Sequence, residues 1–274
     1  MKNGCKYPYF FKATQYLKRK VVKLTNYFYM IGKLRFTLFC FMVLLLNLNG
    51  QECASVKDYD GNIYATVQLG TQCWMAENLR VTHFADGTPL QLGNLTDGQQ
   101  RFYYYPNQAQ ANVAQYGLLY SWYTIMNGHP TSEEVPSGVQ GICPDGWHLP
   151  SNFEWMGLED YLGYKEAYRC GTDVNNVAKA LASKEGWHSD FMTSGQPCCI
   201  VENAKTNNSS GMNVLPAGNF FNTSDGFGVD AGFWTASDGS DVSAPIHHFY
   251  YTNAVIEINC TPKEAAYSVR CVKN

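Results

Sequence analysis

The stretch CPDGWHLPSNFEWMGLEDYLG, at residues 143–163, decides much of the fold that we expect for this chain. Its second half predicts an α-helix, because Ser151 can cap the helix start and Glu154, three residues later, completes a capping box. We expect the helix to end at Gly163. The apolar residues of this segment recur at helical spacing and share one face: Trp155, Leu158, Tyr161 and Leu162.

The first 50 residues have the composition of a targeting leader. They contain nine lysines and arginines and no acidic residue, whereas all 23 acidic residues come later. An apolar run at residues 36–46 follows two basic residues and is shorter than the roughly 20 residues of a membrane span. We predict a signal peptide that starts at Met30 and is cleaved after Gly50. A long basic n-region starting at residue 1 is the alternative.

Residues 51–274 are expected to form a single exported domain, either secreted or held at the cell surface. We find no internal repeat or low-complexity linker in this part of the sequence. It carries eleven basic and 23 acidic residues, a net charge of −12. This balance argues against nucleic acid as a partner, since nucleic-acid binding needs a basic footprint. Once the leader is removed, we do not expect the protein to be an integral membrane protein. A lipoprotein is also not indicated, because the sequence has no box of small residues directly before a cysteine.

The cysteines of the expected domain predict disulfides, because an exported chain folds in an oxidising compartment. There are eight: Cys53, Cys73, Cys143, Cys170, Cys198, Cys199, Cys260 and Cys271. Zinc is the alternative, but no CxxC pair is present. We expect a Cys143–Cys271 bridge that closes a loop of about 128 residues, and a Cys53–Cys73 bridge across a hairpin. The pairing of the other four cysteines stays open.

Short strands and turns are expected over most of the remaining sequence. Residues 56–69 predict two strands around an Asp-Gly turn. Asp58, Asp60 and Asn62 resemble the start of a calcium loop, but a turn explains them better because position 63 is not glycine. Other expected elements are a strand at 72–78, a buried strand or short helix at 116–123, a second helix at 174–183 and a strand beginning at Tyr267. Few helices and many short strands indicate an α+β domain.

Six motifs occur in an order that resembles a known family. They are QCWMAENLR (72–80), YGLLYSW (116–122), CPDGWHLPSNFEW (143–155), NVLPAGNF (213–220), GFWTAS (232–237) and YSVRCV (267–272). Over roughly residues 53–273 the chain resembles the Fibrobacter succinogenes major paralogous domain family, abbreviated FISUMP. The resemblance implies an exported or surface protein with a C-type-lectin-like fold: two main helices, short antiparallel strands, long loops and disulfides. It supplies no catalytic residues.

The sequence offers little evidence for an enzyme, since GxSxG, HExxH, Walker A and GxGxxG motifs are all missing. His148 could act as a base, but a histidine in such a turn more often bonds to the backbone. His247 and His248 would point to opposite faces of a strand, which disfavours a shared metal. Glu154 has its capping role available, and Glu77 has no evident partner, so either could bind a ligand.

The best candidate for binding is the glycine-rich, acidic stretch at residues 219–241. The expected ligand-binding residues are Asn222, Asp225, Asp230, Trp234, Asp238 and Asp241. Oxygen ligands on a loop suit calcium, for which the four aspartates would serve, and a nearby tryptophan suits carbohydrate. A solvated acidic loop without any ligand is the alternative.

Three functions compete on this evidence. The preferred one is a non-catalytic binding module for a glycan or a surface protein, with calcium as the only cofactor considered. The second is a structural component of a bacterial envelope assembly that binds no small ligand. The third is an enzyme related to the formylglycine-generating enzymes, which would need a reactive cysteine.

Overall fold

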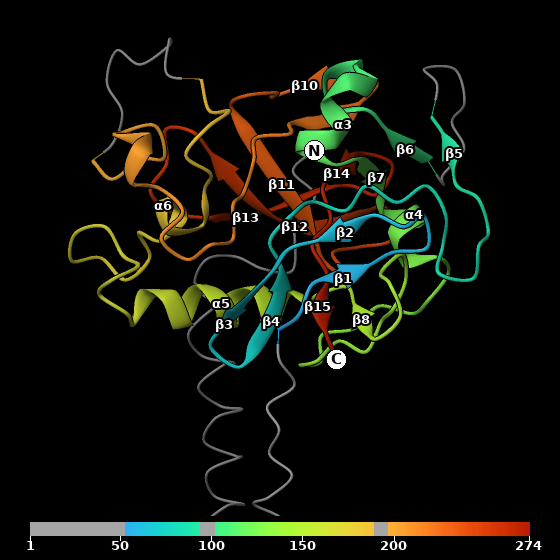
Figure 1. Cartoon of the computed structure of the whole chain (residues 1–274), viewed down its shortest axis with the longest axis horizontal. Helices are drawn as coiled ribbons and strands as arrows, with labels where there is room; N and C mark the ends of the chain where they lie inside the picture. Colours follow the sequence, from blue (N-terminus) through green and yellow to red (C-terminus); the bar gives the residue numbers. More distant parts are fainter. Residues whose placement is uncertain (1–52, 94–101, 189–196) are drawn as a thin grey trace, which may run out of the picture. The chain divides into compact units, whose positions relative to one another are not determined.

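The computed structural model describes residues 53–93, 102–188 and 197–274 (Figure 1). The predicted signal peptide, its start at Met30 and its cleavage after Gly50 lie outside the described residues. The described segments all belong to one structural unit, from Cys53 to Asn274. None of the helices in these segments is long and apolar enough to cross a membrane.

Strands dominate this unit and helices are few. The helices are α3 (Val113–Tyr116), α4 (Trp122–Met126), α5 (Asn152–Gly163) and α6 (Ala178–Leu181), with 3-10 segments η3 (Pro106–Gln108), η4 (Gln110–Asn112) and η5 (Ala204–Thr206). The strands are β1 (Val56–Lys57), β2 (Ile63–Tyr64), β3 (Thr66–Leu69), β4 (Gln72–Met75), β5 (Gln91–Leu92), β6 (Phe102–Tyr104), β7 (Leu119–Ser121), β8 (Trp147–His148), β9 (Asn219–Phe221), β10 (Thr223–Asp225), β11 (Asp230–Trp234), β12 (Ser243–Tyr250), β13 (Glu257–Pro262), β14 (Ala266–Tyr267) and β15 (Val272–Lys273).

The described strands are arranged in four sheets. Their orders are β1-β2, β3-β4-β15-β8, β11-β12-β13 and β10-β9-β14-β7-β6-β5. Neighbouring strands run antiparallel, except that β5 and β6 run parallel. The domain is therefore a mixed α and β structure built mostly from short sheet elements, as the sequence predicted.

The first hairpin confirms that the acidic residues around Asp58 form a turn. The Asp58 Oδ1 accepts a hydrogen bond from the Asn62 backbone N–H at 2.9 Å, and Gly61 takes a positive φ of 85°. Asp60 instead bonds across to Thr82, whose hydroxyl lies 2.9 Å from Oδ2. Both carboxylates thus accept hydrogen bonds from the protein's own donors. These contacts support a turn at this place rather than a calcium loop.

Helix α5 begins and ends where the sequence predicts. The Ser151 hydroxyl accepts from the Glu154 N–H at 3.2 Å, and the Glu154 carboxylate accepts from the Ser151 N–H at 3.0 Å, which completes the capping box. At the other end, a Cβ at Gly163 would collide with the carbonyl of Val174, so only glycine fits this close approach.

The predicted second helix is much shorter than expected. Only Ala178–Leu181 is helical within the predicted 174–183 range. The Asp173 side chain accepts from the Asn175 N–H at 2.9 Å, which holds a turn ahead of the helix. On the other side Ala182 is extended and forms a bridge with Val214. Local side-chain bonding and tertiary pairing therefore override the helical pattern at both ends.

Residues 116–123 contain both of the elements that were considered for them. Strand β7 ends at Ser121, whose hydroxyl accepts from the Thr124 N–H at 3.3 Å and starts α4. The predicted strand at 72–78 is observed as β4, which ends at Met75. The strand predicted to begin at Tyr267 instead ends there, as β14, and strand pairing resumes only at Val272 with β15.

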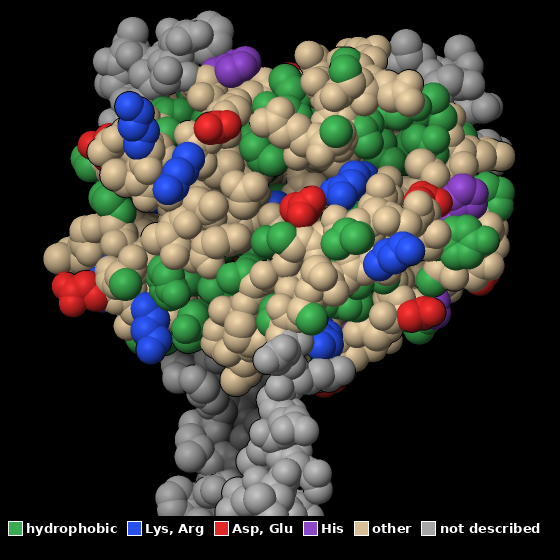
Figure 2. All heavy atoms as spheres, viewed as in Figure 1, with side chains coloured by type: hydrophobic (Ala, Val, Ile, Leu, Met, Phe, Trp, Pro, Cys, Tyr) green, Lys and Arg blue, Asp and Glu red, His purple; other side chains and the backbone are tan. Residues whose placement is uncertain are grey.

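Charged side chains are interspersed on the face of the domain shown in Figure 2. Acidic and basic groups there stand singly or next to each other and do not gather by sign. Most of this face is formed by uncharged side chains and backbone.

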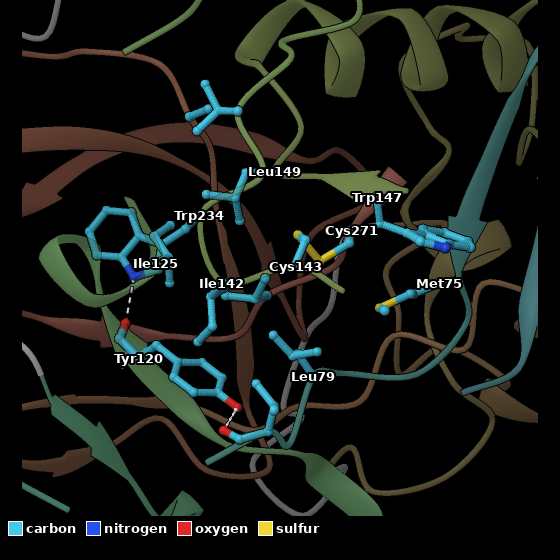
Figure 3. Packing of buried hydrophobic residues seen from close by; sticks show 14 of the residues in the cluster. Met75, Leu79, Tyr120, Ile125, Ile142, Cys143, Trp147, Leu149, Trp234 and Cys271 are labelled. Atoms are coloured by element: carbon cyan, nitrogen blue, oxygen red, sulfur yellow. Dashed lines mark hydrogen bonds between the residues drawn. A yellow bond between two sulfur atoms is a disulfide. The ribbon is translucent and has the colours of Figure 1, made fainter. Parts of the chain in front are cut away.

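Both predicted disulfides are present, and one of them lies in the core. Cys143 and Cys271 are fully buried and their sulfurs are bonded, among apolar side chains that include Met75 and Leu149 (Figure 3). The Cys53–Cys73 bridge is also formed. A third bridge in the described segments joins Cys170 to Cys198, while the buried Cys199 keeps a free thiol.

A second apolar cluster packs α5 onto the β3-β4-β15-β8 and β11-β12-β13 sheets. Trp74 and Trp155 lie with ring centroids 4.6 Å apart, and Trp155 also contacts Phe233. Leu158 and Leu162 are fully buried in the same cluster. The face of α5 that the sequence predicted to be apolar is therefore its packing face.

Strand β15 lies between two strands that are distant from it in sequence. Val272 pairs with Trp74 of β4 on one side and with His148 of β8 on the other. The backbone N–H of Asn274 then bonds to the carbonyl of Gly146 at 3.0 Å. The final residues of the sequence thus join the first and the central motifs in one sheet.

Candidate functional site

A polar pocket of about 410 Å³ lies where the end of β4, α3, the segment after α6 and the loop at 208–215 meet. We call it the polar pocket. Its lining residues are Glu77, Gln115, Ser183, Lys184, Glu185, Asn208, Asn213 and Leu215. Seven of these eight side chains are polar or charged, so the pocket offers many hydrogen-bonding groups beside its apolar surface.

The carboxylate of Glu77 is held in place by two neighbours. Its Oε1 accepts from the backbone N–H of Ala65 and its Oε2 from Nη1 of Arg80, both at 2.9 Å. The Arg80 guanidinium in turn lies over the ring of Tyr64, 4.5 Å from its centroid. Glu77 is therefore a fixed acceptor at the pocket wall, with its charge compensated by Arg80.

Asn208 and Asn213 form one wall of the pocket, and both have a left-handed backbone conformation. Their φ angles are 63° and 54°, a region that asparagine tolerates better than most residues. The Asn208 Oδ1 accepts from the Asn213 N–H at 2.8 Å, which ties the two ends of this turn together. The backbone is fixed by these contacts, while the Asn213 side-chain amide stays available.

The opposite wall depends on the segment from Ser183 to Trp187. The Ser183 hydroxyl donates to the carbonyl of Glu185 at 2.6 Å and accepts from the indole N–H of Trp187 at 3.0 Å. Between them Gly186 has a φ of +88°, and a Cβ there would lie 3.1 Å from the Tyr116 hydroxyl. Burial, together with the charge of Glu185, raises the pKa of Tyr116.

Several polar groups of the pocket are free to bind a ligand. Within the described segments, the side chains of Gln115, Lys184, Glu185 and Asn213 form no hydrogen bond or ion pair. They supply amide donors and acceptors, one ammonium and one carboxylate. A small polar molecule could replace the water that these groups bind.

A buried arginine lies directly behind the Asn213 wall. Arg270 is fully buried, and its guanidinium donates to the carbonyls of Met75, Met212 and Asn213 and to Oδ1 of Asn78, at 2.7 to 3.0 Å. Burial lowers its pKa to about 9, and the charge of Glu77 opposes that shift. Arg270 thus links the first, fourth and last motifs and carries a charge that no carboxylate contacts within the described residues.

The acidic stretch at 219–241 does not form one site. Asn222 and Asp225 are exposed on the β9–β10 hairpin, whereas Asp230 is buried at the start of β11. Burial raises the pKa of Asp230, and the nearby His248, at 3.7 Å, opposes that shift. These residues lie on a sheet and its hairpin rather than on an open loop.

Asp238 and Asp241 belong to a different place, around Lys263. The Lys263 ammonium lies 3.3 Å from Oδ1 of Asp238 and donates to the carbonyl of Asp241 at 3.4 Å. In the described part of the chain, no three His, Cys, Asp or Glu side chains are grouped to hold a metal ion. The four aspartates considered for calcium are therefore divided between two places.

Trp234 is a core residue rather than a surface residue. Its side chain is 1 % exposed, and its indole N–H donates to the carbonyl of Tyr120 at 2.7 Å (Figure 3). Such a ring cannot stack on a sugar, so Trp234 does not belong to a binding surface. The ring is enclosed because β11 is buried along its whole length.

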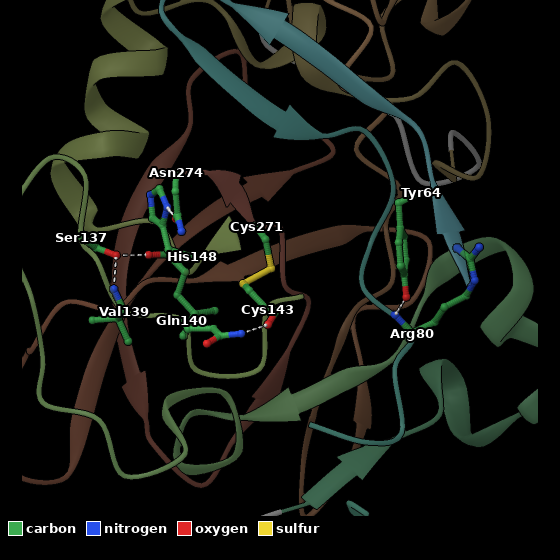
Figure 4. Close-up of a disulfide and its surroundings, with 10 residues drawn as sticks. Tyr64, Arg80, Ser137, Val139, Gln140, Cys143, His148, Cys271 and Asn274 are labelled. Atoms are coloured by element: carbon green, nitrogen blue, oxygen red, sulfur yellow. Dashed lines mark hydrogen bonds between the residues drawn. A yellow bond between two sulfur atoms is a disulfide. The ribbon is translucent and has the colours of Figure 1, made fainter. Parts of the chain in front are cut away.

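His148, considered as a catalytic base, and His247 and His248, considered for a shared metal, all contact side chains of the domain itself. His148 lies near the Cys143–Cys271 bridge, with Nε2 at 2.9 Å from Oε1 of Glu154 and Nδ1 at 2.7 Å from Oδ1 of Asn274 (Figure 4). His247 contacts Glu159 and Asn152 through its two nitrogens, while His248 lies near Asp230. His247 and His248 thus have different partners and do not share a site.

The His148 contacts predict a pH-dependent stability. Burial disfavours the charged ring, but the hydrogen bond and charge of Glu154 outweigh it and raise the pKa of His148. The contribution of His148 to folding stability is therefore fully present below its unfolded-state pKa of about 6.5. It is lost as pH rises through the higher folded-state pKa. We expect the melting temperature of the wild type to fall more steeply above pH 6.5 than that of His148→Gln. His129→Gln, which changes an exposed histidine, is the control and should follow the wild type. Equal pH slopes of the melting temperature for the wild type and His148→Gln would contradict this prediction.

Comparison with protein families finds a match over most of the chain. The model of the Fibrobacter succinogenes major domain matches residues 67–273. No curated protein and no solved structure matches the chain. The matched range includes all the residues of the polar pocket and Arg270.

Most of the pocket residues could not be identified from the sequence. Glu77 was considered there as a possible ligand-binding residue, but Gln115, Lys184 and Asn213 were not. The only available signal was that Glu77 and Asn213 each lie in one of the ordered motifs. Nothing in the spacing of these residues indicates that they meet.

Proposed function

The chain belongs to the Fibrobacter succinogenes major domain family, and we propose that it is a secreted or cell-surface binding module without catalytic activity that binds a carbohydrate in the polar pocket. The pocket is the observation that carries this proposal. Its volume of about 410 Å³ lies within the range of small-molecule sites. Free amide, carboxylate and ammonium groups are suited to the hydroxyl groups of a sugar.

Export and the finer fold assignment are parts of the same proposal. Three disulfides in the described segments favour an oxidising compartment, since such bonds are rare in the cytosol. Few helices, short antiparallel strands and disulfide staples are compatible with a C-type-lectin-like fold. An experimental structure superposed on C-type-lectin-like domains would test that assignment directly.

A glycan array on the non-reduced, exported protein tests the function. We expect Gln115→Ala to weaken retention of the bound glycan about tenfold, because one or two hydrogen bonds are lost. Gln91→Ala, on exposed strand β5, is the matched control and should bind like the wild type. Since the pocket contains no group of metal ligands among the described residues, a calcium chelator should leave binding unchanged.

The array also separates the competing functions. Failure to retain any glycan, together with copurification with envelope polymers, would replace the binding module by a structural role. Binding that disappears with the chelator and survives Gln115→Ala would place the ligand outside the polar pocket.

A further inference from the structure

We infer that the polar pocket selects sugars that carry a carboxylate, such as hexuronic acids, over neutral sugars. This inference rests on the proposed function and names the ligand class of the same pocket. It follows from the balance of charges at the pocket wall and directly behind it.

The charged groups around the pocket leave an excess of positive charge. Glu77 and Arg80 form an ion pair at 2.9 Å and compensate each other. The remaining groups are Lys184 and Glu185, which line the pocket, and Arg270, which lies behind Asn213. Two positive groups therefore face one negative group, and an anion in the pocket would balance them.

Arg270 makes the strongest contribution because it is out of water. Its described acceptors are three backbone carbonyls and the amide oxygen of Asn78, none of which carries a formal charge. A buried charge is costly and acts over a longer range than a solvated one. Glu77, which Arg80 already pairs, offsets the charge of Arg270 only in part. A carboxylate bound near Asn213 would offset more of this buried charge.

Lys184 adds a solvent-exposed positive charge at the edge of the pocket. It is exposed and has no ion-pair partner in the described part of the chain. An exposed ammonium can reach a ligand carboxylate at little cost in desolvation. The amides of Gln115 and Asn213 then remain for the hydroxyl groups of the sugar.

The negative net charge of the domain as a whole makes the positive pocket a favoured position for an anion. Residues 51–274 carry a net charge of −12, and charges on the face in Figure 2 are mixed rather than gathered into a basic patch. Anions are therefore repelled by most of the molecule, and a small cationic pocket provides one favoured position for them.

Matched pairs of acidic and neutral oligosaccharides test the inference. Oligogalacturonate and oligogalactose of equal length would be titrated into the exported protein by calorimetry, at low and moderate salt. We expect the acidic sugar to bind about tenfold more tightly, and raising the salt to reduce that preference. The preference should also disappear below the pKa of the sugar carboxylate.

Two variants that change the charge of the pocket in opposite directions identify the source of the preference for acidic sugars. Lys184→Met should weaken acidic-sugar binding about threefold, whereas Glu185→Gln should strengthen it about threefold. Both side chains are exposed, so folding should be unaffected. Lys205→Met and Glu166→Gln, also exposed but outside the pocket, are the matched controls and should change nothing.

Each outcome leads to a different conclusion. Equal affinity for acidic and neutral sugars would overturn the inference and leave the proposed function standing. A preference for the acidic sugar that neither variant changes would also overturn it, because the charge would then come from elsewhere. Binding of neither sugar, nor of any array glycan, would instead contradict the proposed function.

Discussion

Replacing Cys143 and Cys271 together by alanine is expected to lower the free energy of unfolding by about 5 kcal/mol on the chain-entropy model. The bridge joins residues 128 apart in sequence, so its loss frees a long loop in the unfolded chain. Both cysteines are fully buried in the core, so the variant also loses contacts there. Denaturant titration of the non-reduced proteins measures the change, and the slope m should rise as the unfolded state expands.

The Cys170–Cys198 bridge provides the comparison. It joins residues only 28 apart and lies outside the apolar clusters. Removing it should cost about 3.5 kcal/mol on the same model, and less if the surrounding loop moves freely. A larger loss for this variant than for the Cys143–Cys271 variant would contradict the central role that we assign to the core bridge.

Arg270→Met is expected to destabilise the domain by about 4 kcal/mol, because four acceptors, in three buried bonds and one partly buried bond, lose their donor at once. Those acceptors belong to Asn78, Met75, Met212 and Asn213, in segments that are far apart in sequence. Methionine fills similar space without donating a hydrogen bond, so the effect reports bonding more than packing. The midpoint of denaturant unfolding, compared with that of the wild type, measures it.

Two further variants separate charge from geometry at this position. Arg270→Lys keeps the charge but cannot reach all four acceptors, so we expect an intermediate loss. Arg80→Met removes a partly exposed arginine with one ion pair and should cost about 1 kcal/mol or less. If Arg80→Met were as damaging as Arg270→Met, burial would not be the source of the effect.

Local signals in the sequence gave reliable predictions. The capping box of Ser151 and Glu154 and the Asp-Gly turn after Asp58 depend on residues within four positions of each other. The opposite orientations of His247 and His248 follow from the period of a strand. The Cys143–Cys271 pair is a long-range prediction that the structure confirms, and it was based on the places of the two cysteines in the central and last motifs.

Predictions that needed tertiary information were less successful. The acidic stretch was treated as one loop, but its residues occupy a hairpin, a buried strand and the surroundings of Lys263. Trp234 was treated as a ligand-facing ring, although its strand is buried on both faces. The polar pocket draws on residues from Glu77 to Leu215, and no sequence period reveals that such distant side chains meet.

The position of β15 constrains when the domain can finish folding. Strands β4 and β8 have no direct pairing and are joined only through Val272 and Lys273 within the described sheet. Ribosomes synthesise a chain from its N-terminus, so both strands wait until β15 has been made before their sheet can form. The sheet that holds the first and central motifs is therefore among the last parts of the domain to close.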